Sequence, residues 1–197
     1  MKNKNLLSHR YEEPERSVLY MVGTPIGNLN DLSYRAINIL RNVSLIACED
    51  TRHTKKIMNK FNITNSLISF NKHNSLKKIP QIIKALKENK SIALVSDAGM
   101  PGICDPGEDI AKAVKLEGFD VICIPGACAA LTALISSGMP SSSFIFLGFL
   151  ASSCLFIVDQ RQFALVFALG EIKKVVDKPG LYVLTFGEPI TVSSIVS

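Results

Sequence analysis

The chain contains no tryptophan, three histidines and five cysteines, and no two cysteines have C-x-x-C spacing. This scarcity argues against a disulfide framework and against a zinc site, so we expect reduced cytosolic thiols and no metal. The patterns G-x-G-x-x-G and G-x-x-x-x-G-K-[ST] are also missing, which makes a dinucleotide fingerprint and a P-loop poor fits.

Apolar runs long enough to cross a membrane are missing as well. The most membrane-like stretch, residues 144–158, has no charged residue, but Gly148, Ser152 and Ser153 interrupt it. It is also shorter than the roughly 20 residues of a spanning helix. We therefore expect a strand there that opens a second domain, and a cytoplasmic protein without membrane contact. Residues 1–17 are polar and of mixed charge, which indicates a loose N-terminal extension and no signal peptide.

What the sequence does have is an alternation of short apolar runs and amphipathic segments. The apolar runs predict strands at 18–22, 44–48, 66–69, 91–96, 120–124 and 144–149. The amphipathic segments predict helices at 32–42, 52–60, 76–88, 107–117 and 127–137, the first of them capped by Asp31. This order indicates an α/β fold with a parallel sheet covered by helices on both faces.

The clearest linker, Ser- and Pro-rich, is 138–143. We therefore divide the chain into an extension (1–17), an α/β domain (18–137), this linker, and a partial second domain (144–197).

Three of the predicted strands run into loops rich in glycine and proline. These segments are VLYMVGTPIGNLNDLSYRA (18–36), SIALVSDAGMPGICDPG (91–107) and VICIPGACAA (121–130). If the strands are parallel, their loops face the same edge of the sheet, where ligands bind in α/β folds. A connecting loop rich in turn residues is the plainer interpretation of each motif taken alone.

Five motifs occur in a characteristic order: VGTPIGNLNDLSYRA, CEDTRHT (48–54), KHN (72–74), ALVSDAGMPGICDPG and IPGACAALTAL. The series resembles the bacterial ribosomal RNA small-subunit methyltransferases that methylate a cytidine ribose 2′-oxygen, within the tetrapyrrole methylase superfamily. The likeness covers roughly residues 18–150. It implies a tetrapyrrole methylase-like fold, S-adenosylmethionine as cofactor, ribosomal RNA or the small subunit as partner, and a possible homodimer.

The resemblance implies a cofactor site in the cleft between the first domain and the second. A sulfonium cation suits carbonyl oxygens and a carboxylate, and Asp97 is the best-placed carboxylate; its alternative role is to cap its own glycine turn. Gly99 and Gly126 would let the backbone approach the ligand. The expected cofactor-binding residues are Pro25, Ser96, Asp97, Ala98, Gly99, Met100, Ile103, Gly126, Cys128 and Ala129.

Methyl transfer to a ribose oxygen also requires the hydroxyl to lose its proton. Glu49, Asp50 and His73 are the candidate bases, and the sequence does not choose among them. The alternative for the two carboxylates is a helix N-terminus, where negative charge is favourable, and the alternative for His73 is a surface turn.

Positive charge is concentrated in one window. Residues 52–90 hold ten Lys and Arg and one acidic residue, a net +9, so the rest of a chain of net charge +5 carries −4. Such a window attracts RNA phosphates, although it also fits ordinary solvated helix faces. The candidate RNA-binding residues are Arg52, Lys55, Lys56, Lys77 and Lys78.

The likeness weakens after Phe149-Leu150, where the family continues into a second domain of about a hundred or more residues. Residues 151–197 do not follow that pattern, so we expect an incomplete second α/β domain and a truncated chain with weak or no activity. Two further functions stay open: a non-catalytic remnant that folds and binds RNA, and a small-molecule methylase acting on a tetrapyrrole-type acceptor.

Overall fold

The computed structural model describes residues 14–103, 105–142, 144–149, 155–158, 162–168, 171–176, 180–183 and 190–196. The chain divides into two compact units, Met1–Ala127 and Cys128–Ser197, and each is described by itself. The predicted linker at 138–143 lies inside the second unit, and the division into functional domains stays a prediction.

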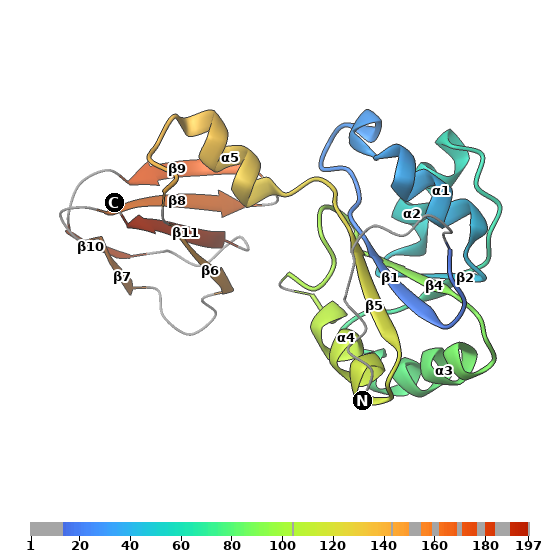
Figure 1. Ribbon diagram of the computed structural model, residues 1–197. Coiled ribbons are helices and arrows are strands. Elements are labelled where there is room, and N and C mark those ends of the chain that lie inside the picture. The colour runs from blue at the N-terminus through green and yellow to red at the C-terminus, as the bar shows by residue number, and fades with distance from the viewer. Residues whose placement is uncertain are drawn as a thin grey trace. The chain divides into compact units, whose positions relative to one another are not determined.

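The first unit is built on a five-stranded sheet in which all paired strands are parallel (Figure 1). Its strand order is β3-β2-β4-β1-β5. The strands are β1 (Val18–Val22), β2 (Leu45–Cys48), β3 (Leu67–Ser69), β4 (Ile92–Val95) and β5 (Asp120–Ile124). The predicted α/β fold and its parallel sheet are confirmed.

Four helices cover the two faces of this sheet (Figure 1). They are α1 (Tyr34–Asn42), α2 (Thr51–Lys60), α3 (Ser75–Lys87) and α4 (Gly107–Leu116). All five residues of β1 are buried, and alternate side chains enter opposite cores. Tyr20 and Val22 belong to the core that α1 and α2 complete, whereas Leu19 and Met21 belong to the core under α3 and α4. Burial on both faces explains why the strands read as continuous apolar runs.

The start of α1 differs from the prediction. Asp31 was expected to cap this helix, but it closes the 3-10 turn η1 (Leu29–Asp31), and the α-helix begins at Tyr34. The cap is Ser33, whose Oγ accepts a hydrogen bond from the backbone N–H of Ala36 at 3.1 Å. Both residues are good capping types, so residue type alone does not distinguish them.

The described part of the second unit contains one helix followed by strands. Helix α5 (Ala129–Ser137) ends at Gly138, whose φ of +66° is the left-handed conformation typical of a helix C-terminus. All the described strand pairs are antiparallel, in sheets of order β6-β11-β8-β9 and β10-β7. The strands are β6 (Ile145–Phe149), β7 (Leu155–Val158), β8 (Gln162–Ala168), β9 (Glu171–Val176), β10 (Gly180–Val183) and β11 (Ile190–Val196).

The predicted strand at 144–149 is confirmed as β6, and β7 occupies the end of the same membrane-like stretch. Within the described ranges, the helices are too short or too polar to span a membrane.

Two glycines allow the loops after β1 and β5 to touch. A Cβ on Gly23 would lie 2.8 Å from the Cα of Gly126, and a Cβ on Gly126 would lie 2.8 Å from the Cα of Gly23. Real Cβ atoms essentially never come so close to backbone, so the neighbouring loops fit together only without side chains here.

We therefore expect Gly23→Ala and Gly126→Ala each to lower the free energy of unfolding by about 1–3 kcal/mol, as overpacking does. Either substitution forces the same two backbones apart, so the double variant should cost less than the sum of the single variants. Urea denaturation of the three variants measures both effects. Fully additive losses would show that the two glycines act independently.

Candidate functional site

The loops after β1 and β4 are locked together at the carboxyl edge of the sheet. Thr24 and Gly99 exchange two backbone hydrogen bonds, N–H to O at 2.9 Å and 3.0 Å, which form an isolated antiparallel bridge. The Thr24 side chain is buried, and its Oγ1 donates to the carbonyl oxygen of Ser96 at 3.1 Å. The role of Thr24 could not be predicted from the sequence, because it depends on a partner 75 residues away.

Gly99 is required by the backbone of its own loop. Its φ is +82°, and a Cβ there would lie 3.3 Å from Cδ1 of Ile26 and 3.5 Å from the carbonyl oxygen of Ala127. A larger residue would therefore strain the loop itself, whether or not a ligand is present. The close approaches that Gly99 and Gly126 permit are to other parts of the chain, and their contact with a ligand stays a prediction.

The remaining predicted cofactor residues differ in exposure. Ala98 and Ile103 are exposed and Met100 is half-buried, so these apolar side chains are open to a ligand. Pro25 and Ser96 are buried, and the Oγ of Ser96 donates to the carbonyl oxygen of Gly99 at 3.1 Å. Cys128 and Ala129 are half-buried and belong to the second unit.

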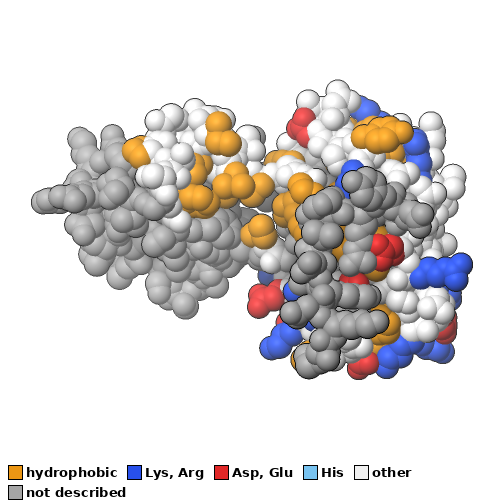
Figure 2. All heavy atoms as spheres, viewed as in Figure 1, with side chains coloured by type: hydrophobic (Ala, Val, Ile, Leu, Met, Phe, Trp, Pro, Cys, Tyr) orange, Lys and Arg blue, Asp and Glu red, His pale blue; other side chains and the backbone are white. Residues whose placement is uncertain are grey.

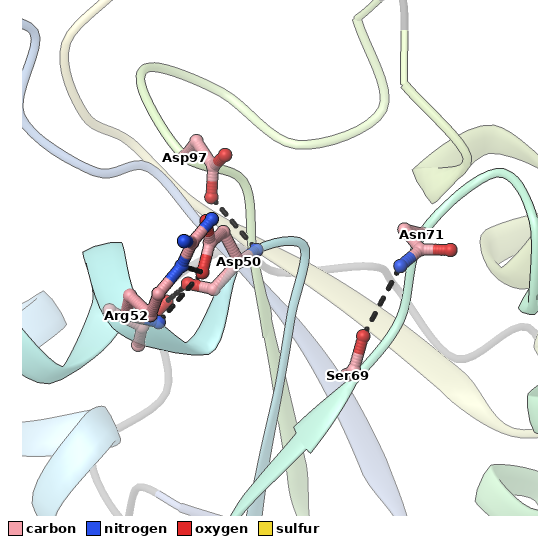
Figure 3. A network of polar contacts seen from close by, with 6 residues as sticks. Asp50, Arg52, Ser69, Asn71 and Asp97 are labelled. Atoms are coloured by element: carbon pink, nitrogen blue, oxygen red, sulfur yellow. Dashed lines mark hydrogen bonds and ion pairs between the residues drawn. The ribbon is translucent and has the colours of Figure 1, made fainter.

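Asp97 joins the end of β4 to the start of α2 (Figure 3). Its Oδ1 accepts a hydrogen bond from the backbone N–H of Asp50 at 3.0 Å. The bond goes to a neighbouring loop, which corrects the alternative in which Asp97 caps its own glycine turn. Oδ2 of Asp97 accepts no hydrogen bond from the described part of the chain, so a half-buried carboxylate oxygen stays available at this edge.

Asp50 is the N-cap of α2. Its Oδ1 accepts from the backbone N–H of Arg52 at 2.8 Å, and its Oδ2 forms an ion pair with Nη2 of Arg52 at 2.7 Å. Hydrogen bonding to Arg52 lowers the pKa of Asp50 to about 2. A carboxylate that is such a weak base, and is already engaged, is poorly suited to accept a proton near neutral pH.

The two other candidate bases lie in different settings. His73 is exposed in the turn between β3 and α3. The side chains of Asn71 and Asn74 hold the backbone of this turn: Oδ1 of Asn71 accepts from the His73 N–H at 3.0 Å, and Oδ1 of Asn74 accepts from the Asn71 N–H. Glu49 directly follows β2 and is half-buried. Burial raises the pKa of Glu49, and the nearby carboxylates of Asp97 and Asp105 raise it further.

Glu49 lines a very small hollow of about 10 Å³ at the carboxyl edge, together with Ser96 and Asp105. Asp105 is not among the site residues predicted from the sequence. Its Oδ1 accepts from the N–H groups of Gly102 at 2.8 Å and Gly107 at 2.7 Å, which fixes the loop at the start of α4. The Asp-Pro-Gly sequence before a predicted helix was the signal that could have identified it.

The predicted RNA-binding residues do not share one helix face. Arg52, Lys55 and Lys56 lie on α2 and Lys77 and Lys78 on α3, and these helices cover opposite faces of the sheet. Both helices follow a parallel strand, so both begin at the carboxyl edge, and all five residues lie in their first two turns. Figure 2 shows Lys and Arg side chains at the surface of the first unit, interspersed with acidic ones.

This geometry defines a class of protein: a parallel α/β domain in which the loops after β1, β4 and β5 converge on one edge of the sheet. The family model for tetrapyrrole (corrin/porphyrin) methylases matches residues 18–161. The chain belongs to this family.

Curated relatives match the first part of the chain closely. A protein of Halalkalibacterium halodurans is 50% identical over 139 residues, covering 71% of this chain and 48% of the relative. A protein of Thermotoga maritima is 51% identical over 132 residues, covering 67% of this chain and 60% of the relative. Both are named ribosomal RNA small subunit methyltransferase I. The chain thus spans about half the length of such relatives.

Solved structures support the fold at low sequence identity. Uroporphyrin-III-C-methyltransferase from Thermus thermophilus matches with a TM-score of 0.54 and 14% identity, over 92% of this chain and 94% of its own. A cobalamin synthesis related protein from Corynebacterium diphtheriae matches with a TM-score of 0.56 and 13% identity, over 91% and 97%. The predicted tetrapyrrole methylase-like fold is confirmed.

The setting of Glu49 has a consequence for stability. A carboxyl group whose pKa is raised by folding contributes stability below its unfolded pKa, and that contribution is lost as the pH rises through its folded pKa. Glu49→Gln should therefore raise the thermal midpoint at pH 7, and the gain should vanish towards about pH 4, near the ordinary pKa of glutamic acid. Scanning calorimetry across this range measures it.

Glu108→Gln, at an exposed position in the first turn of α4, is the matched control and should give no gain at pH 7. A gain for Glu49→Gln that persists unchanged at low pH would show that the charge of Glu49 is not its source.

Proposed function

We propose that this chain carries the cofactor-binding domain of an S-adenosylmethionine-dependent methyltransferase acting on small-subunit ribosomal RNA in the cytoplasm. The observation that carries the proposal is the 50% identity over 139 residues to a protein named for that reaction. The finer assignment, to a cytidine ribose 2′-oxygen, rests on the motif series at 18–36, 48–54, 72–74, 93–107 and 124–134. Pairing of two copies stays a prediction.

The residues at the carboxyl edge suit this cofactor. S-adenosylmethionine supplies a methyl group on a sulfonium, which is a good leaving group, so alignment and exclusion of water matter more than acid–base chemistry. Oδ2 of Asp97 accepts no hydrogen bond from the described residues, so it can attract the cationic sulfonium. The accessible apolar side chains of Ala98, Met100 and Ile103 can pack against a ring of the cofactor.

Glu49 is the proposed proton acceptor for the ribose hydroxyl. Its partly buried carboxylate, beside Asp97 and Asp105, is a stronger base than an ordinary glutamate, because burial raises its pKa. Asp50 is occupied by Arg52, and His73 lies in a separate loop between β3 and α3.

The cationic side chains at the starts of α2 and α3 are proposed to contact RNA phosphates. Positive charges on both sides of the sheet edge would contact the two sides of an RNA strand that crosses the cofactor loops. Arg52 pairs with Asp50, but the four lysines of this set form no ion pair with the described residues. Near the opposite edge, Lys87 pairs with Glu117 and Lys90, just after α3, pairs with Glu88, each at 2.8 Å. This difference favours a footprint on the carboxyl edge.

The cofactor assignment is tested with Asp97→Asn. Asparagine keeps an oxygen that can accept the Asp50 N–H but has no charge, so affinity for S-adenosylmethionine should fall about tenfold, ~1.4 kcal/mol. S-adenosylhomocysteine lacks the sulfonium charge and should bind both proteins alike. Isothermal titration with the two ligands measures the difference. Equal losses for both ligands would point to a damaged loop, and no loss for either would remove Asp97 from the site.

The RNA assignment is tested through salt dependence. Replacing Lys55, Lys56, Lys77 and Lys78 with glutamine should reduce the slope of log affinity against log salt by up to about 3, since each phosphate contact contributes about 0.7–0.9. Lys84, Lys87, Lys90 and Lys115, exposed near the opposite edge, make the control with the same change in net charge. Equal slopes in the two variants would show a diffuse charge effect without a defined footprint.

A further inference from the structure

The guanidinium group of Arg52 is held in place although its side chain is 86% exposed. Nε donates to both oxygens of Asp50 at 3.1 Å, and Nη2 donates to Oδ2 at 2.7 Å. Two nitrogens of the guanidinium thus contact both oxygens of one carboxylate, which makes the pair bidentate, with Nε shared between the two oxygens. Exposed arginines without such a partner sample many rotamers, and they lose that freedom when they bind.

Asp50 is itself fixed by two further hydrogen bonds. Its side chain caps α2 through the N–H of Arg52 at 2.8 Å, and its own N–H donates to Asp97 at 3.0 Å. A continuous series of contacts therefore runs from the end of β4 through Asp97 and Asp50 to the guanidinium of Arg52 (Figure 3).

The pairing leaves part of the guanidinium available. A guanidinium carries five N–H donors in one plane, and Asp50 uses Nε and one side of Nη2. The donors of Nη1 and the outer donor of Nη2 lie on the edge turned away from Asp50. Two adjacent donors in a fixed plane match two oxygens of a phosphate. Lys55 and Lys56, exposed on the same helix, add positive charge.

We propose that Asp50 is a positioning residue, which holds the free edge of Arg52 ready for a phosphate of the RNA backbone. The inference rests on the proposed function, because it takes RNA as the partner of this surface. According to this proposal, the acidic residue Asp50 strengthens the binding of RNA, which is a polyanion. Simple electrostatics predicts the reverse, since Asp50 offsets the charge of Arg52 and repels phosphate.

The two explanations predict opposite changes in RNA affinity when the charge of Asp50 is removed. Asp50→Asn removes the negative charge and keeps a good helix cap. If Asp50 positions Arg52, affinity for in vitro transcribed small-subunit ribosomal RNA should fall about two- to tenfold, the cost of ordering one free side chain. If Asp50 only offsets charge, the affinity should rise. Asp31→Asn, which removes an exposed acidic residue from η1, is the control and should not weaken binding.

Two further variants separate positioning from helix capping. Asp50→Ser keeps the cap but cannot form the bidentate pair, so it should bind RNA as weakly as Asp50→Asn. In an Arg52→Gln background, Asp50→Asn should no longer weaken binding, because the residue to be positioned is gone. Recovery of wild-type affinity by serine, or an undiminished loss in the Arg52→Gln background, would overturn the proposal.

The outcomes also distinguish this inference from the proposed function. If the parent chain does not bind the ribosomal RNA, both fall. If it binds with the salt slope carried by Lys55, Lys56, Lys77 and Lys78, yet Asp50→Asn binds as tightly or more tightly, only the positioning role of Asp50 is overturned.

Discussion

All five strands of the first unit run in the same direction, and the placement of the candidate residues depends on this constraint. Parallel strands must be joined by crossovers, so the helices that follow β1, β2, β3 and β4 all start at one edge. The carboxyl edge therefore collects glycine-rich loops, helix N-termini and the polar residues that cap them. Residues from 23 to 126 reach that edge although the sequence scatters them over most of the unit.

The same constraint gathers several carboxylates at the carboxyl edge. Acidic residues lie at the ends of β2 and β4, where backbone N–H groups at the following helix starts can bind them, as with Asp50 and Asp105. Burial and, next to it, the proximity of other carboxylates raise the pKa of Glu49, while the bond to Arg52 lowers that of Asp50. Neighbouring carboxylates in one motif thus acquire opposite tendencies to hold a proton, and so different chemical roles.

Sequence periodicity was sufficient to predict where the strands and α-helices of the first unit occur. The predicted strands at 18–22 and 120–124 coincide with β1, which is buried throughout, and with β5, a partly buried strand at the edge of the sheet. The beginning of α1 could not be placed, since Asn28, Asp31 and Ser33 all offer capping side chains and only the backbone path selects among them.

The contacts of the site were less predictable than its position. The glycine-rich loops marked the edge, but the Asp97–Asp50 bond requires that β4 lie beside β2, and the Gly23–Gly126 contact requires that β1 lie beside β5. Strand order is not contained in local periodicity. The roles of Thr24 and Gly99 depend on the same unseen neighbours.

The bridge between Thr24 and Gly99 also affects how the site can move. Loops usually open independently of the sheet that carries them, and their amide hydrogens then exchange rapidly with solvent. Here each of the two amides donates to the other residue's carbonyl, and Thr24 Oγ1 also donates to the carbonyl oxygen of Ser96, directly after β4. Exchange at either amide therefore requires the ends of β1 and β4 to separate. The floor of the candidate site therefore belongs to the cooperative unit of the sheet, and flexibility for ligand entry is left to exposed residues such as Ala98 and Ile103.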